Sequence, residues 1–132
     1  MSIRTVCWLS LLSLVSLVGV ACAAQHEAFS DPEKAGPDHA VQGEYAGEGK
    51  FGEETKKVGV QVVALGDHEF EATAFVGGLP GDGWSRGDNT HTGKGKTNGD
   101  VTELTSDKGG TGTIKDGTLT IIDGNGNKCG EL

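Results

Sequence analysis

The most constraining feature of the sequence is a two-residue alternation of apolar side chains in two consecutive segments. The apolar positions are Val58, Val60 and Val62 in the first segment, and Phe70, Ala72, Ala74 and Val76 in the second. Alternation with a period of two indicates β-strands that bury one face. No helical period of useful length appears from Gly43 onward. The sequence therefore predicts an all-β domain over residues 43–132.

The loop between these two segments sets their register. A two-residue loop would place Val62 opposite Glu71 and mix the two faces. A three-residue loop over residues 66–68 unites the apolar side chains on one face, with the pairs Ala64–Phe70, Val62–Ala72, Val60–Ala74 and Val58–Val76. Such a loop requires a left-handed third residue. His68 occupies that position, and histidine tolerates this conformation better than most residues.

Two further hairpins are predicted from turn dipeptides. Asn98-Gly99 separates strands at 92–97 and 100–105, and Asp116-Gly117 separates strands at 111–115 and 118–122. Both dipeptides suit type I′ turns, and the second places Ile114 opposite Leu119 and Thr113 opposite Thr120. With further strands at 44–51 and 128–132, the count is about eight. The chain has 23 glycines among 132 residues, which fits many tight turns. We expect a small antiparallel meander, either a barrel or a sandwich.

The N-terminus is typical of an export signal. One positive residue, Arg4, precedes an apolar run over 6–20, and small residues follow it at 21–24. This pattern predicts a signal peptide over residues 1–24; an uncleaved anchor is the alternative. Two cleavage routes are predicted. In the first, the small residues 21–23 form an A-x-A type cleavage site. In the second, a lipobox-like sequence directs cleavage before Cys22, which is then lipidated. Both routes predict an extracytoplasmic protein in the periplasm, on the cell surface or secreted, with membrane contact only through its leader or lipid. Residues 25–42 are expected to be a flexible linker.

The composition and motifs argue against several classes of function. The formal net charge of −8 disfavours nucleic-acid binding. No metal-ligating or catalytic motif appears, so we predict no metal, no cofactor and no catalytic residue. The stretch from Asp123 to Asn127 begins like a calcium loop, but Lys128 stands where that motif needs glycine, so a turn is favoured. Cys129 is the only cysteine after residue 24, which excludes an intramolecular disulfide in the processed chain.

The candidate binding site lies in the least strand-like part of the domain, residues 77–91. Trp84 offers an aromatic face for a sugar, and charged neighbours could bind hydroxyl groups; the candidate ligand-binding residues are Asp82, Trp84, Arg86 and Asp88. The alternative is that Trp84 folds back and closes one end of the barrel. The predicted partner is a glycan or a protein of the cell envelope.

Three stretches, 43–48, 57–67 and 77–84, carry a resemblance to a known arrangement. They resemble the N-terminal β-rich module of exported planctomycete-type proteins, in which a 3-keto-disaccharide hydrolase domain commonly follows. The resemblance implies an extracytoplasmic setting and a link to glycans. It carries over no activity and no catalytic residue, because the resemblance covers residues 43–132 and does not extend to the hydrolase domain. His68 departs from the glycine expected in that module.

Three functional hypotheses follow. The first is an exported non-catalytic β-module that binds a ligand such as a glycan at residues 77–91. The second is a structural or interaction domain of the cell envelope that uses exposed strand edges or Cys129. The third is a small hydrolase with carboxylate chemistry, for which the sequence indicates no specific pair.

Overall fold

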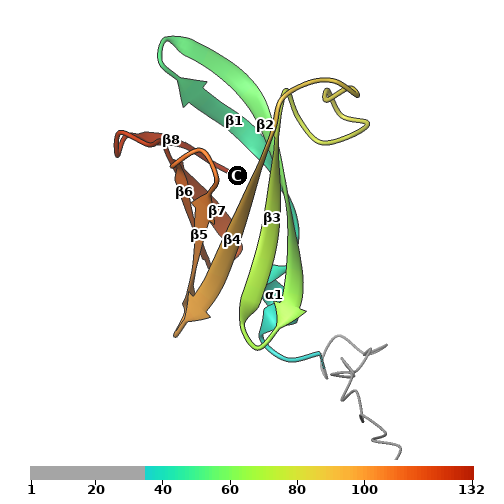
Figure 1. The fold of residues 1–132 in the computed structure, drawn as a ribbon, viewed down its shortest axis with the longest axis vertical. Coiled ribbons are helices and arrows are strands. Elements are labelled where there is room, and N and C mark those ends of the chain that lie inside the picture. The colour runs from blue at the N-terminus through green and yellow to red at the C-terminus, as the bar shows by residue number, and fades with distance from the viewer. Residues whose placement is uncertain (1–34) are drawn as a thin grey trace, which may run out of the picture.

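Eight antiparallel strands form a closed barrel in the computed structural model, which describes residues 35–132. Each strand pairs with its neighbours in the sequence, and β8 returns to β1 (Figure 1). The elements are α1 (Asp38–Val41), β1 (Gly43–Phe51), β2 (Glu54–Gly66), β3 (Glu69–Val76), β4 (Thr90–Asn98), β5 (Val101–Ser106), β6 (Thr111–Lys115), β7 (Thr118–Ile122) and β8 (Lys128–Glu131). The predicted all-β meander is confirmed, in its barrel form. The expected signal peptide 1–24, with Cys22, lies outside the described residues.

The predicted register between β2 and β3 is confirmed, but the turn that produces it differs. All four predicted pairs are present, from Ala64–Phe70 to Val58–Val76. Asp67 and His68 both have positive φ, at 53° and 63°, so they form the centre of a two-residue turn. Gly66 pairs with Glu69, and a β-bulge lies between Ala64 and Gly66. The bulge adds the residue that a three-residue loop would have supplied, and the same face stays buried.

One of the two other predicted turns has the expected residues at its centre. Asp116 and Gly117 both have positive φ, at 51° and 76°, as a type I′ turn requires. The prediction for Asn98-Gly99 is wrong by one residue. Asn98 instead pairs with Val101 as the last residue of β4, and only Gly99, at 65°, has positive φ in this turn. That pattern fits a type II′ turn centred on Gly99 and Asp100.

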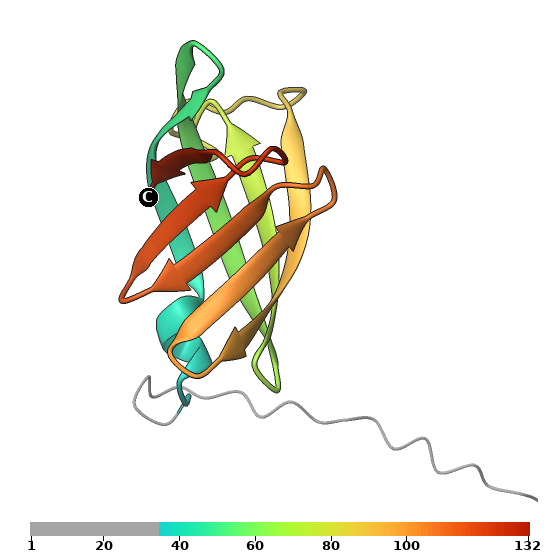
Figure 2. The same cartoon turned by 90° about the vertical axis from the view of Figure 1, so that its left-hand side faces the viewer.

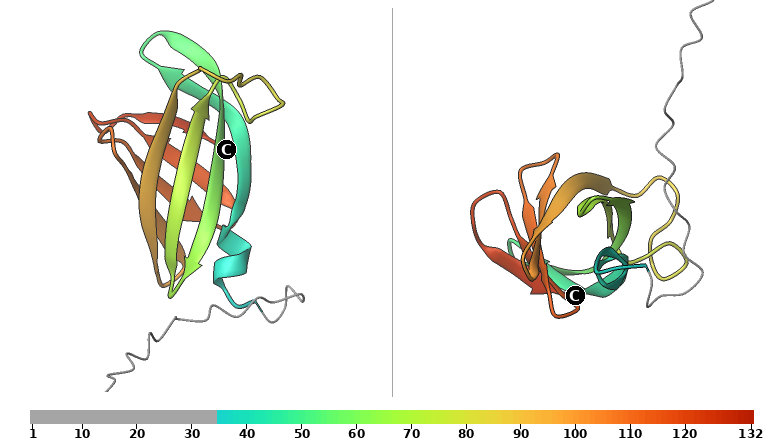
Figure 3. Two further views of the ribbon diagram at one scale, coloured as in Figure 1. Left: turned by 45° about the vertical axis from the view of Figure 1, so that its right-hand side comes forward. Right: turned by 90° about the horizontal axis from the view of Figure 1, so that it is seen from below.

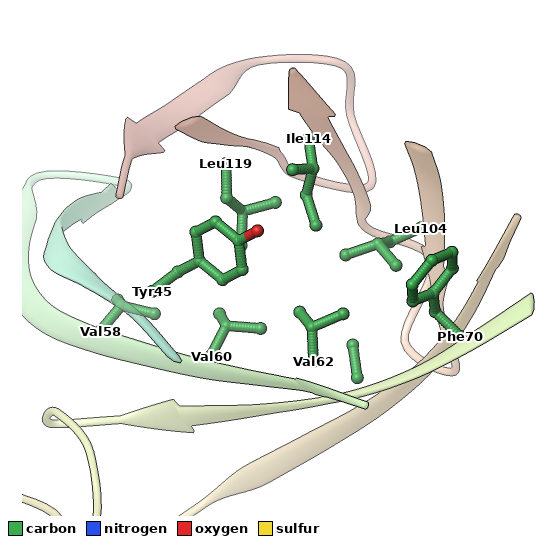
Figure 4. Close-up of a cluster of buried hydrophobic side chains, with 9 residues drawn as sticks. Tyr45, Val58, Val60, Val62, Phe70, Leu104, Ile114 and Leu119 are labelled. Carbon is green, nitrogen blue, oxygen red and sulfur yellow. The ribbon is translucent and has the colours of Figure 1, made fainter. Parts of the chain in front are cut away.

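The core lies inside the barrel, and its two aromatic side chains, Tyr45 and Phe70, come from strand ends near α1. Phe70 and Leu119 are each 1% exposed, and they converge with side chains from opposite walls (Figure 4). The buried cluster consists of Tyr45, Val58, Val60, Val62, Phe70, Ala72, Leu104, Ile114 and Leu119. Its members come mainly from alternate positions of their strands, as a barrel interior requires.

Helix α1 lies at one end of the barrel, at the bottom of Figure 2. Tyr45 Oη donates a hydrogen bond of 2.6 Å to the carbonyl oxygen of Val41, and Val41 packs against the core. The Asp38 carboxylate accepts a hydrogen bond from the backbone N–H of His68 at 3.1 Å, and its other oxygen lies 2.7 Å from His68 Nδ1. The last residues of the expected linker 25–42 thus belong to the folded domain, because Val41 supplies apolar surface to it. No helix among the described residues is long and apolar enough to cross a membrane.

The barrel closes through a short seam between β1 and β8. Only two residue pairs, Glu48–Glu131 and Gly49–Gly130, join these strands. Leu132 continues past the seam and exchanges two backbone hydrogen bonds with Leu119. In the sheet order of residues 35–132 every strand has two neighbours, and β1 meets β8 along only part of its length.

Candidate functional site

The predicted site loop, residues 77–89 in the structure, lies against the outer wall of the barrel. Figure 3 shows it outside the ring of strands. A Cβ atom on Gly59 would lie 2.6 Å from Leu79 Cγ, so the loop packs on β2 where only glycine leaves room. The Trp84 ring packs edge-to-face on Phe75, with ring centroids 5.3 Å apart. Phe75 alternates with the inward-facing Ala74, so this contact is on the outside. Trp84 therefore does not close an end of the barrel.

The four predicted site residues are partly engaged in holding this loop together. Asp82 forms an ion pair of 2.7 Å with Lys57 of β2. The Asp88 carboxylate accepts a hydrogen bond from the backbone N–H of Ser85 at 2.9 Å, and its carbonyl oxygen accepts one from Trp84 Nε1 at 3.3 Å. Trp84 is half-buried and Arg86 is exposed. None of the four lines the cavity inside the barrel or the shallow hollow beside His39.

Replacing Trp84 with alanine should therefore destabilise the domain. We expect the free energy of unfolding to fall by about 1–2 kcal/mol, because the variant loses the aromatic pair and exposes Phe75. Arg86→Ala, at an exposed position of the same loop, should change it by less than about 0.5 kcal/mol. Urea denaturation measures both. A Trp84→Ala protein as stable as Arg86→Ala would contradict a packing role for the tryptophan.

A different concave site lies inside the barrel, at the end opposite α1. It is a partly open cavity of about 240 Å³. Its wall is mostly apolar, and its lining includes Phe51, Val58, Ala74, Val76, Ile121 and Cys129. The space exists because Ala74, Gly93 and Gly112 occupy inward positions here, whereas the large rings of Tyr45 and Phe70 do not line it. The sequence contains this signal, since Ala72 and Ala74 interrupt the large apolar side chains of β3.

The polar residues at the mouth include Asp123, which is held by its own turn. Its Oδ1 accepts hydrogen bonds from the backbone N–H groups of Asn125 and Asn127, at 2.8 and 2.9 Å. These hydrogen bonds lower the pKa of the Asp123 carboxyl below its usual value, and the bond from the Asn127 backbone N–H is the strongest cause. The segment that begins like a calcium loop is thus a hydrogen-bonded turn between β7 and β8.

Cys129 is buried and lines the same cavity. Its Sγ donates a weak hydrogen bond to the carbonyl oxygen of Asn127 at 3.6 Å. Burial is the main cause that raises the pKa of the Cys129 thiol, which makes it a poor nucleophile at neutral pH. A thiol in this position does not present itself to another chain. The interaction-domain hypothesis itself stays a prediction.

His91 contributes a polar side chain to the cavity wall. It lies on the inner face of β4, directly opposite Ala74 of β3, and both residues line the cavity. Its Nδ1 atom is covered from solvent and has no hydrogen-bond partner among the described residues. A buried polar atom without a partner is uncommon in proteins and calls for an explanation.

No model of a known protein family, no curated protein and no solved structure matches this chain. The resemblance to the β-rich module of planctomycete-type proteins stays a prediction. The geometry of the barrel interior is therefore the basis for the functional argument.

Proposed function

We propose that this chain is an extracytoplasmic, non-catalytic binding protein whose barrel takes a small, mainly apolar molecule into its interior. The observation that carries the proposal is the partly open, apolar cavity of about 240 Å³ between the strand ends. Eight-stranded barrels are just wide enough either to fill with side chains or to hold one small ligand. An apolar cavity of roughly 150 Å³ accommodates benzene, so this one has room for a substituted ring. The extracytoplasmic setting rests on the export pattern of residues 1–24.

The interior supports binding better than the outer loop does. At residues 77–89 the carboxylates of Asp82 and Asp88 are already engaged by Lys57 and Ser85, so a glycan would have to compete for them. In the cavity, by contrast, binding removes apolar surface of the ligand and of the wall from water, and this burial stabilises the complex. We therefore assign the ligand to the interior rather than to residues 77–91.

Carboxylate hydrolysis has less support than binding. Glu69, Glu71 and Glu103 are exposed, and they stand opposite lysines on the neighbouring strand β4. The Glu69 carboxylate lies 3.9 Å from Lys96 Nζ. Such exposed pairs form a solvated outer surface, and no cleft brings these carboxylates together.

Filling the cavity tests the proposal. We expect p-xylene to raise the melting temperature of the wild-type protein, because a ligand that binds only the folded state stabilises it. In Ala74→Leu the added side chain occupies the ligand's space, and the affinity should fall at least tenfold. Ala46→Leu is the matched control, because it makes the same change at an exposed position of β1. It should respond to p-xylene like the wild type.

The reaction of Cys129 gives a second measurement on the unmodified protein. We expect p-xylene to slow labelling of this residue by methyl methanethiosulfonate, measured by mass spectrometry of the peptide that contains it. The proposal would be overturned if saturating p-xylene changed neither the melting temperature nor the labelling rate. An equal response in Ala74→Leu and Ala46→Leu would likewise place the ligand elsewhere.

A further inference from the structure

We infer that the interior ligand carries a hydroxyl group, and that His91 is the residue that hydrogen-bonds it. The inference rests on the binding function proposed above and narrows its ligand class to small hydroxylated ring compounds. It starts from the unpartnered Nδ1 atom of a histidine that lines an otherwise mostly apolar cavity.

The other polar side chains of the lining are less suited to meet a ligand inside. The Asp123 carboxylate accepts hydrogen bonds from its own turn, and the Cys129 thiol donates to Asn127. Ser106 Oγ donates a hydrogen bond to the Asp107 carboxylate. The remaining polar residues of the lining are exposed, namely Thr92, Thr105, Lys108 and Thr111. His91 is thus the group whose hydrogen-bonding capacity a ligand would complete.

The chemistry of imidazole favours a hydroxyl group over a charged one. In a neutral histidine one ring nitrogen donates and the other accepts, depending on the tautomer. A hydroxyl group can both donate and accept, so it suits Nδ1 in either tautomer. A carboxylate or ammonium group would lose its hydration in the apolar cavity, and a single neutral imidazole does not replace that hydration.

The position of His91 gives a ligand access after a small adjustment. The Nδ1 atom is covered in the structure, so we expect the ring to turn about its Cβ–Cγ bond as the ligand enters. This torsion is broad and roughly two-fold in histidine, so the rotation meets little intrinsic resistance. The cross-strand partner of His91, Ala74, has only a methyl group and leaves room for the turn.

The test compares two probes of similar shape, p-cresol and p-xylene, which differ by a hydroxyl group in place of a methyl group. Affinities are measured by calorimetry on the purified full chain. In His91→Phe we expect p-cresol to bind about tenfold more weakly, as for the loss of one hydrogen bond, while p-xylene binds as before. His39→Phe is the matched control, because His39 is exposed on α1 at the opposite end of the barrel. It should leave both affinities unchanged.

A measurement on the wild type covers the case in which His91→Phe does not fold. The ring ¹⁵N resonances of His91 should shift on addition of p-cresol and move much less with p-xylene. Equal weakening of both probes in His91→Phe, or ring resonances that respond equally to both, would overturn the role of His91. Unchanged p-cresol binding in that variant would do the same. Failure of the wild type to bind either probe would instead refute the proposed function itself.

Discussion

Replacing Phe70 with alanine is expected to lower the free energy of unfolding by about 3–5 kcal/mol. Phe70 is 1% exposed and belongs to the buried cluster inside the barrel. Removing its ring loses the transfer free energy of the buried carbons and leaves a void that the closed sheet cannot collapse to fill. Small domains are stable by only about 5–15 kcal/mol. The variant should therefore unfold at a much lower urea concentration. The slope of its unfolding free energy against urea concentration should be similar to that of the wild type.

Phe51→Ala is the matched control for this substitution. Phe51 is 38% exposed and lies at the mouth of the cavity, so its truncation should lower the free energy of unfolding by about 1 kcal/mol or less. The comparison tests the difference between a side chain of the buried cluster and one at the mouth of the cavity. If the two variants were equally destabilised, Phe70 would not be packed as the structure shows.

Replacing Gly130 with alanine is expected to break the seam of the barrel. A Cβ atom at this position would lie 2.5 Å from the carbonyl oxygen of Glu48 and 3.2 Å from Gly49 Cα. Both are backbone atoms of the partner strand, so no side chain can move aside. Because only two residue pairs join β1 to β8, the strands have little other contact to keep them aligned. We expect a loss of about 3 kcal/mol, the upper part of the range for overpacking.

Amide hydrogen exchange shows where in the barrel the Gly130→Ala substitution weakens the structure. In Gly130→Ala the amides of Gly49 and Glu131 should exchange faster, whereas those in the middle of the β2–β3 pair should change no more than global stability requires. Gly124→Ala is the matched control, because its added Cβ would lie at an ordinary 3.5 Å from the carbonyl oxygen of Gly109. A Gly130→Ala protein with the stability and exchange pattern of Gly124→Ala would show that the seam is looser than the structure indicates.

The sequence was sufficient to predict the all-β meander and two registers, that of β2 with β3 and that of β6 with β7. The β2–β3 register follows from apolar periodicity, because a shift by one residue would turn Val60 and Ala74 outward. Turn conformations were harder to predict. At the turn between β4 and β5 a single left-handed glycine, Gly99, is enough. Whether Asn98-Gly99 or Gly99-Asp100 forms the centre of the turn depends on how β4 pairs with β5. Local residue preferences do not determine that choice.

The candidate site could not be predicted in the same way. Trp84 is an isolated aromatic residue in a long loop, a pattern that favours a binding site. Its ring instead packs on Phe75, and this contact depends on how the loop folds onto the outer wall. The cavity depends on the sum of side-chain volumes from many strands. Ala74 and His91 are adjacent only because β3 pairs with β4 in one register. Small inward residues were visible in the sequence, but their spatial grouping was not.

The order of the strands also determines how the chain reaches its folded state. From β1 to β8, every strand pairs with the one that follows it in the sequence, and short turns connect most of these pairs, so little loop-closure entropy opposes them. The pairing of Glu48 with Glu131 instead joins residues separated by most of the domain. We therefore expect folding to proceed as the growth and curling of a ribbon of hairpins, with closure between β1 and β8 as the last and slowest conformational step.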